Sequence, residues 1–316
     1  MKKFSAAIIG CGKVAGMYGN DGNTNIQSHA QAYQDNPRTK LTAVFDPNKE
    51  QLERFCKKWN IENGYNSLDQ MMSNEKIEIV SICSPTSFHY EHFSYLSKIP
   101  VSGIFAEKPI ANDLNEAKKI VELTKNIPVA INYFRRWNSE LQNLKKDINR
   151  NTYGKLHKII LHHTKGIRNN GSHVIDLMNW FFGEIKLKKV INKYEINEDD
   201  LGVDCLLITE QGAQIILSHI PSVDYVYMNI EFICELGIIN LCQRGQEIKI
   251  FVKEKDPDYR VFNRLVLKEN KQTKWQECFT NAITNITKSI QTGEQILCTP
   301  EDAYKSSVLC EKIIQS

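Results

Sequence analysis

The sequence predicts an α/β domain with a doubly wound parallel sheet, followed by an α+β domain with a mainly antiparallel sheet. Three observations lead to this prediction. Strand-like and helix-like segments alternate up to about residue 134, a period-two pattern follows after about residue 150, and 316 residues exceed what one small core accommodates. We therefore expect domains at 1–125 and 126–316, and leave open whether the last helix packs back on the first domain.

The first half predicts a parallel sheet because its strand-like runs are mostly continuous in Val, Ile and Ala, as in strands that are covered on both faces. The expected strands are Ala6–Ile9, Leu41–Phe45, Ile77–Cys83, Gly103–Ala106 and Val129–Tyr133. The helices expected between them include Asn48–Trp59, Ser67–Met72, Ser87–Ser97 and Leu114–Thr124. Strand and helix taking turns in this way is typical of a sheet with helices on both sides.

The second half predicts an antiparallel sheet with one face free, since strands follow one another through short turns such as Gln211-Gly212. One strongly apolar helix, Val174–Phe182, interrupts the strands, and two helices end the chain, Trp275–Ser289 and one that begins at Thr299. The expected strands are Leu156–His163, Lys186–Ile196, Val203–Thr209, Ala213–His219, Val226–Glu235, Gly237–Cys242, Glu247–Val252 and Val261–Leu267.

Composition is that of an ordinary soluble globular protein, with 41% hydrophobic and 24% charged residues. The formal charge of +3 comes from 40 basic and 37 acidic residues spread along the chain, a balance that predicts neither nucleic acid nor a membrane as partner. The first apolar run is too short for a signal peptide, and none approaches the roughly 18 residues of a membrane span. Nine scattered cysteines without a Cys-x-x-Cys pair favour reduced thiols in a cytoplasmic protein, without disulfides or a metal site.

A glycine-rich turn, GCGKVA from Gly10 to Ala15, follows the first expected strand and is expected to open a helix. In this G-x-G-x-x-G/A form the first glycine permits the tight turn, Gly12 lets the backbone approach a pyrophosphate, and Ala15 keeps helix and strand close. The helix start offers N–H groups to the phosphates. The motif therefore predicts a dinucleotide site that includes Lys13 and Val14; the alternative is a plain glycine turn.

Asp46 stands at the end of the second expected strand. A carboxylate there would accept hydrogen bonds from the adenosine ribose and repel a 2′-phosphate, which favours NAD over NADP. Its distance from Gly12 exceeds the usual spacing of about 20 residues, and the polar loop at Gly19–Asn25 reads as an insertion that explains the excess. The alternative role for Asp46 is to cap the next helix.

Two further segments, Ser81–His89 and Ala106–Pro109, follow the ends of later strands. Ligands of doubly wound sheets bind at the carboxyl ends of strands, so both segments are expected to line the cofactor cleft. Lys108 would then lie in a partly dry site near the nicotinamide ring.

The apolar helix at Val174–Phe182 has two ionisable residues at its start, His173 and Asp176. Burying both without partners would cost several kcal/mol. A purely structural explanation is available: Asn170 or Ser172 caps the helix, Asp176 complements its dipole, and His173 hydrogen-bonds a backbone carbonyl. The functional explanation is a reaction site.

Four motifs together, GCGKVA, SPTSFH, EKP and GSHxxD, resemble the glucose-fructose oxidoreductase and inositol dehydrogenase (Gfo/Idh/MocA) family. The resemblance covers essentially the whole chain. It implies a Rossmann domain that binds NAD(P), a second domain with an open sheet, and redox chemistry at a carbinol of a sugar or cyclitol. It also implies a homo-oligomer, dimer or tetramer, formed through the sheet of the second domain.

The family's functional residues are carried over by motif position. Lys108 matches its active-site lysine and His173 its catalytic histidine. Where many members have aspartate four residues before that histidine, this chain has Asn169, which replaces an orienting carboxylate with a neutral amide. The positions matching those that line the dinucleotide are Ser84, Pro85, Thr86, His89 and Glu107.

The chemistry that these residues suggest is the oxidation of a secondary alcohol. His173 is the candidate base, because an imidazole titrates close to working pH. Lys108 would hydrogen-bond the same oxygen and stabilise developing negative charge. Further substrate contacts are expected among Asn132, Tyr133, Arg135, Arg136, Arg168, Asn169 and Asp176, although each arginine could equally form a surface ion pair.

We predict a cytoplasmic NAD-dependent dehydrogenase or reductase that acts on CH–OH of a sugar, with a nucleotide sugar of bacterial surface-polysaccharide synthesis as substrate. Three alternatives stay open. The chain could be an inositol or free-sugar dehydrogenase, a non-catalytic NAD-binding sensor, or a redox-assisted glycosidase. Fold alone does not decide among them.

Overall fold

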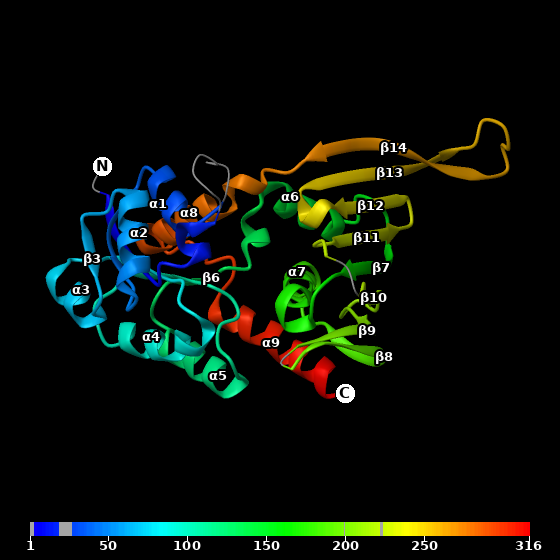
Figure 1. Cartoon of the computed structure of the whole chain (residues 1–316). Coiled ribbons are helices and arrows are strands. Elements are labelled where there is room, and N and C mark those ends of the chain that lie inside the picture. Colours follow the sequence, from blue (N-terminus) through cyan, green and yellow to red (C-terminus); the bar gives the residue numbers. More distant parts are fainter. Residues whose placement is uncertain (1–2, 19–26, 199, 222–223) are drawn as a thin grey trace. The chain divides into compact units, whose positions relative to one another are not determined.

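The computed structural model of this chain describes residues 3–18, 27–198, 200–221 and 224–316 (Figure 1). The chain divides into two compact units, each made of two stretches of sequence. The first unit comprises residues 1–137 and 276–304, and the second comprises residues 138–275 and 305–316. The domain boundary that the sequence suggested at residue 125 concerns parts of the chain that fold independently, and it stays a prediction.

The first unit is built on a six-stranded sheet in which neighbouring strands are parallel, in the order β3-β2-β1-β4-β5-β6. The predicted doubly wound parallel sheet is thus confirmed. Strand order reverses between β1 and β4, which is where ligands bind in such sheets. The strands are β1 Phe4–Ile9, β2 Thr39–Phe45, β3 Asn63–Tyr65, β4 Ile79–Ile82, β5 Gly103–Ala106 and β6 Val129–Ile131.

Helices connect these strands, and most of them begin where a side chain caps the first turn. Ser28, Asn48, Ser67 and Asp113 each accept a hydrogen bond from a backbone N–H of the helix that follows. Neither α1 nor β3 was predicted, because a short polar helix and a three-residue strand give no apolar pattern. The helices are α1 His29–Asp35, α2 Lys49–Trp59, α3 Leu68–Asn74, α4 His89–Leu96, α5 Leu114–Leu123 and α8 Cys278–Thr292.

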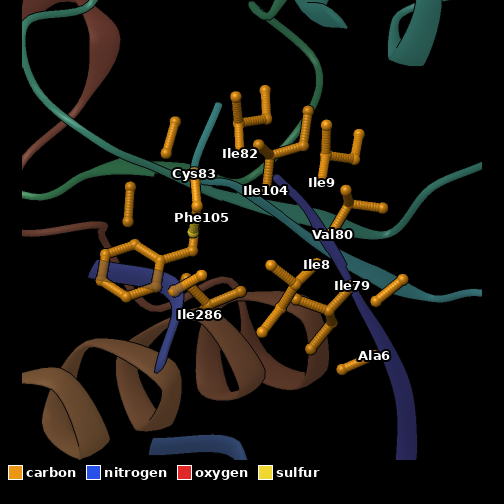
Figure 2. Close-up of a cluster of buried hydrophobic side chains, with 14 of the residues drawn as sticks. Ala6, Ile8, Ile9, Ile79, Val80, Ile82, Cys83, Ile104, Phe105 and Ile286 are labelled. Carbon is orange, nitrogen blue, oxygen red and sulfur yellow. The ribbon is translucent and has the colours of Figure 1, made fainter. Parts of the chain in front are cut away.

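A helix from near the end of the chain completes the core of the first unit. Figure 2 shows Ile286 of α8 beside Phe105 of β5, with Ile8 and Ile79 of the neighbouring strands above the same helix. A Cβ atom on Gly103 would come within 2.8 Å of Ile286 Cγ2, so a glycine at this position lets α8 lie close against the sheet. The Rossmann unit therefore includes residues that are distant in sequence.

The second unit contains an eight-stranded sheet in the order β14-β13-β12-β11-β7-β10-β9-β8. Neighbouring strands are antiparallel, except that β7 and β10 are parallel. The predicted mainly antiparallel sheet is confirmed. The strands are β7 Leu156–His163, β8 Lys186–Asn197, β9 Asp200–Ile208, β10 Gln214–His219, β11 Met228–Cys234, β12 Gly237–Cys242, β13 Glu247–Lys255 and β14 Asn263–Gln272.

One face of this sheet is covered by helix α7, Ser172–Phe182. Alternate residues of β11 are buried, as the period-two pattern predicts, and Phe232 among them stacks on Phe181 of α7 with ring centroids 5.6 Å apart. Two further helices belong to the unit: α6, Ser139–Asn149, which was not predicted, and the second part of α9, Pro300–Gln315.

Over the described ranges of the chain, no helix combines the length and the apolar character needed to cross a bilayer. No group of three or more histidine, cysteine, aspartate or glutamate side chains with metal-binding geometry occurs in those ranges either.

Candidate active site

The glycine turn at the end of β1 lies close against the segment that follows β4. Gly10 adopts a φ of +90°, and a Cβ atom there would lie 2.7 Å from Ser84 N and 2.8 Å from Ser84 Cα. Only glycine fits, because both the left-handed backbone and the contact with the segment after β4 exclude a side chain. The turn is fixed to β2 by a 2.8 Å hydrogen bond from Gly10 N–H to Phe45 O.

The helix expected after this turn is a single wide turn, Lys13–Met17, which ends with a 3.0 Å bond from Tyr18 N–H to Lys13 O. A short helical turn thus follows the motif, as expected. Trp59 of α2 packs against it: its Nε1–H donates to Gly16 O at 3.2 Å, and its ring occupies the space of a side chain at Gly16.

The turn still fits a dinucleotide phosphate. An added Cβ atom at Gly12 would meet nothing within 4 Å, so the backbone there is open to a ligand, while Ala15 is fully buried against the sheet. The first intra-turn hydrogen bond is donated by Gly16 N–H, so the N–H groups of Lys13 and Val14 precede it at the positive end of the turn.

Asp46 lies just after β2 and is 5% exposed. Its carboxylate accepts hydrogen bonds from Cys11 N–H at 2.8 Å, Asn48 N–H at 2.8 Å and the Gln51 side chain at 2.7 Å. The cap of α2 is Asn48, whose side chain accepts from Gln51 N–H at 3.1 Å, so the capping role considered for Asp46 belongs to Asn48. Asp46 instead ties the glycine turn to β2. The polar loop expected at residues 19–25 lies outside the described residues.

The segment after β4 is held in place by two histidines. His92 Nδ1 lies 3.0 Å from Ser84 Oγ, and His89, which is 1% exposed, has ring nitrogens 3.1 Å from Ser84 O and 3.3 Å from Ile110 O. Burial lowers the pKa of both rings, that of His92 to about 4. A neutral His89 ring can donate to only one of its two carbonyls. Pro85 is exposed and Thr86 half-buried, so these residues reach the surface while His89 lies behind them.

A buried polar network lies behind Glu107, at the carboxyl end of β5. Glu107 Oε1 accepts from Asn132 Nδ2 at 2.6 Å and lies 3.0 Å from His29 Nε2. His29 Nδ1 lies 2.8 Å from Ser81 Oγ, which in turn lies 2.8 Å from the hydroxyl of Tyr33. Burial by itself would raise the pKa of Glu107, but the bonds from His29 and Asn132 and the charge of Lys108 outweigh it, and the net pKa is below the usual value. Glu107 is therefore an ionised carboxylate beside Lys108.

His29 and Tyr33 are residues of this network that the sequence analysis missed, whereas Ser81 begins a segment that it expected at the cleft. His29 starts a helix that was not predicted, and its partners lie 52 and 78 residues away in sequence. The available signal was a histidine directly after the Ser28 cap, which a pattern search does not distinguish from a surface histidine.

The residues after β6 show which of the predicted substrate contacts face inward. Asn132 is 2% exposed, and its Oδ1 is a buried acceptor without a hydrogen-bond partner in the described part of the chain. Arg136 is also 2% exposed and donates to Leu297 O at 2.8 Å, with Asp302 Oδ2 3.4 Å away. Arg136 therefore has a structural ion pair, whereas Arg135 stacks on the Phe134 ring, with 4.8 Å between guanidinium carbon and ring centroid. Tyr133 is buried.

In the second unit, α7 continues a wide helical turn at Ile167–Gly171 that precedes it. His173 is half-buried in the first turn of α7. Asp176 lies in the second turn, is 2% exposed and accepts from Ser306 Oγ of α9 at 3.3 Å, so it is not the first-turn dipole partner that was considered. Neither Asn170 nor Ser172 caps the helix, since both lie within the helical segment.

Arg168 and Asn169 lie in the turn before α7, and both are exposed. Arg168 forms a bidentate ion pair with Glu311 of α9, with Nε–Oε1 at 2.7 Å and Nη2–Oε2 at 2.8 Å. This pair corresponds to the alternative considered for Arg168, a surface ion pair. A substrate that binds Arg168 would have to displace the Glu311 carboxylate from the guanidinium. Lys108 belongs to the first unit and His173 to the second. Their convergence on one substrate stays a prediction.

The N-terminal part of the chain matches a known protein family. A family model described as an oxidoreductase family with an NAD-binding Rossmann fold, Gfo/Idh/MocA, matches residues 4–132. The match to this family is thus confined to residues 4–132. The matched segment includes the glycine turn, Asp46, Glu107, Lys108 and Asn132. It ends before the helix that bears His173.

Similarity to known Gfo/Idh/MocA-type proteins is low in sequence and high in fold. The chain is 26% identical over 119 residues to a myo-inositol 2-dehydrogenase of Thermotoga maritima, a match that spans 37% of this chain and 35% of that protein. The chain thus spans about a third of the length of this curated relative. An Agrobacterium radiobacter oxidoreductase solved with NAD+, L-tartaric acid and magnesium aligns with a TM-score of 0.75 at 18% identity, covering 100% of this chain and 96% of that one.

A 3-ketoreductase of Actinomadura kijaniata, a Lys-to-Ala variant solved with TDP-benzene and NADP, aligns with a TM-score of 0.79 at 15% identity. The alignment covers 99% of this chain and 98% of that chain. At these identities the likeness concerns the fold. The chain therefore shares its two-sheet architecture with proteins that were solved with either nicotinamide dinucleotide.

Two histidines buried in the second unit are expected to make the stability of the protein sensitive to acid. His163 of β7 and His219 of β10 are register partners with ring centroids 5.3 Å apart, and they are 0% and 5% exposed. Burial, and then the neighbouring His219, lower the pKa of His163 to about 4. Asp204 and Asp200 act in the opposite direction on the pKa of His219, which burial nevertheless lowers.

We expect the free energy of unfolding to fall as pH falls from about 6.5 to about 4, by about 2–3 kcal/mol for His163 alone. In this window the unfolded chain binds a proton at His163 and the folded protein does not. Urea unfolding at pH 7.5 and 4.5 measures the effect. His163→Phe should reduce the difference between the two pH values, whereas His157→Phe, at an exposed position of the same strand, should preserve it. An unchanged difference in His163→Phe would contradict the assignment.

Proposed function

We propose that the protein is an NAD-dependent oxidoreductase that transfers a hydride between nicotinamide and a secondary carbinol of a sugar. The observation that supports this most is the arrangement at the end of β5, where Lys108 follows an ionised Glu107 that His29 and Asn132 hold in place. This pair follows β5, next in the sheet to β4, and the turn after β4 contacts the glycine turn at Gly10. A charged lysine next to a dinucleotide-binding turn suits chemistry at the nicotinamide end.

The residues of the chain would divide the reaction between them. Bound NAD supplies the hydride acceptor. Lys108 donates a hydrogen bond to the substrate oxygen and stabilises the negative charge that develops there. His173 accepts the hydroxyl proton in oxidation and returns it in reduction. Asn132 Oδ1, a buried acceptor without a protein partner in the described ranges, suits the carboxamide N–H of a nicotinamide.

For the substrate we propose a nucleotide sugar of bacterial surface-polysaccharide synthesis, with a free sugar or inositol as the alternative. The 3-ketoreductase with bound TDP-benzene supports the first, and the myo-inositol 2-dehydrogenase supports the second. Asn169 and His173 are four residues apart on one helical segment and share a face, where both could contact a sugar ring. A cytoplasmic location and a homo-oligomer formed through the second sheet complete the proposal.

The test is a panel of UDP-sugars, TDP-sugars, free sugars and inositols, each incubated with NAD+ and followed at the NADH absorbance. Turnover of a nucleotide sugar with the free compounds inert supports the proposal. Turnover of inositol alone would replace the substrate class. Tight NAD binding without turnover of any compound would favour a sensor. Product analysis separates a net dehydrogenation from glycosidic cleavage.

The cofactor preference depends on Asp46, and we expect Asp46→Ser to raise the KM for NAD+ about tenfold. The same change should lower the KM for NADP+, because the carboxylate that would repel a 2′-phosphate is gone. Steady-state kinetics with both cofactors measures the ratio. Glu78→Ser serves as the control, since Glu78 accepts a bond from Ser5 N–H at the opposite end of β1. An NADP preference in the unaltered protein would contradict this reading of Asp46.

A further inference from the structure

The helical segment that carries Asn169 and His173 begins without a local cap. Gly166 precedes its first turn in an extended conformation, with φ −76° and ψ 172°, and has no side chain to accept a bond. The first four N–H groups of a helix have no acceptor within the helix and need one from elsewhere. A short polar side chain at this position usually provides it.

Asp200 provides this acceptor from another element. It is the first residue of β9 and is 8% exposed. Its Oδ1 accepts from Arg168 N–H at 2.9 Å and its Oδ2 from Asn169 N–H at 3.1 Å. Both carboxylate oxygens are thus bound to successive amides at the start of the helix, the arrangement in which a charged acceptor is strongest.

The space around Gly166 shows how closely Asp200 replaces a local cap. A Cβ atom on Gly166 would lie 2.0 Å from Asp200 Cγ and 2.1–2.3 Å from its two oxygens. The φ of Gly166 is one that any residue adopts, so the required glycine reflects space alone. The carboxylate of Asp200 therefore occupies the place that a capping side chain at residue 166 would take.

Asp200 adds a negative charge at this helix start. The Arg168 guanidinium is paired with Glu311 of α9. From the other elements, His219 of β10 and Cys310 of α9 are near enough to Asp200 for its charge to raise the pKa of each, although burial leaves the pKa of His219 below its usual value. A carboxylate is favourable at a helix start because it faces the positive end of the helix dipole.

We propose that Asp200 is a positioning residue of the candidate active site. It caps the helical segment that bears Asn169 and His173 and so fixes the orientation of both side chains. The role assigned to His173 rests on the proposed function, whereas the capping geometry is independent of that function.

The capping geometry is tested by amide hydrogen exchange of the full chain without substrate. In Asp200→Ala, exchange at Arg168 and Asn169 is expected to speed up at least tenfold. Gly166→Asp in the same background restores a local cap, so protection should return. Gly166→Asp alone places two carboxylates in the same space, so exchange at both amides should be faster than in Asp200→Ala or in the double variant. Asp204→Ala, in the same strand but bonded to His219 N–H, is the matched control and should leave both amides unchanged.

The positioning role is tested by kcat and by the KM for NAD+ in the same variants. Asp200→Ala is expected to lower kcat about tenfold, because the side chains of Asn169 and His173 lose their fixed orientation, and to change the KM for NAD+ less than twofold. The double variant Asp200→Ala/Gly166→Asp should restore kcat.

Each outcome separates the two claims. Unchanged exchange in Asp200→Ala would overturn the cap. Faster exchange with normal kcat would overturn the positioning role and leave only a stabilising contact. If the unaltered protein turns over no compound of the panel, the proposed function fails, and the exchange rates still decide whether Asp200 caps the helix.

Discussion

Replacing Lys108 by methionine is expected to lower kcat/KM for hydride transfer by about 10²–10³-fold, while NAD binding changes less than threefold. The loss follows because the ammonium would be a hydrogen-bond donor to the oxygen on which negative charge develops. Methionine has a similar length and removes only the donor and the charge. Glu107 keeps its bonds from His29 and Asn132, so the fold should persist.

Two assays measure this prediction. NADH absorbance gives turnover, and isothermal titration gives the affinity for NAD+. Lys118→Met is the matched control, because Lys118 is an exposed lysine of α5 in the same unit. Turnover of Lys108→Met within threefold of the unaltered protein would remove Lys108 from the chemistry.

Replacing His29 by leucine is expected to destabilise the protein by about 2–4 kcal/mol. His29 is fully buried and lies between Ser81 Oγ and Glu107 Oε1. Leucine of similar size fills the space but leaves the buried carboxylate with one bond fewer and the Ser81 hydroxyl with one partner fewer. Because the pKa of Glu107 is below the usual value, its contribution is present above about pH 4.5 and disappears as pH falls below that.

Urea unfolding of the unaltered protein, His29→Leu, Glu107→Gln and the double variant measures this coupling. In the Glu107→Gln background the cost of His29→Leu should shrink by at least 1 kcal/mol, because no buried charge is left unpaired. Glu122→Gln, an exposed glutamate of α5, serves as the control for the second change. Additive costs, or a cost below about 1 kcal/mol for His29→Leu alone, would show that the network contributes little.

The parts of the fold that follow from local pattern were predictable. Strands that are continuously apolar predicted the parallel sheet, because such strands are buried on both faces. Strands in which apolar and polar residues alternate predicted the second sheet, because such strands are buried on one face. Short or polar elements such as α1 and β3 lack that spacing. The parallel pairing of β7 with β10 depends on which strands meet across the sheet, which spacing does not encode.

The candidate site shows the same difference between local and long-range features. The positions of Gly10, Gly12 and Asp46 at a tight turn and a strand end were predictable, because these local features constrain single residues. The contacts that organise the rest are long-range: His29 with Glu107 across 78 residues, and Asp200 with Asn169 across 31.

The most direct test of the account is a crystal structure of the protein with NAD+ and a nucleotide sugar that it oxidises. The account predicts Lys108 Nζ and a ring nitrogen of His173 within about 2.6–3.2 Å of the same substrate oxygen, on the carbon that faces nicotinamide C4. A complex in which a well-ordered carbinol faces the nicotinamide while either side chain lies beyond hydrogen-bond reach of its oxygen would contradict the proposed division of the chemistry.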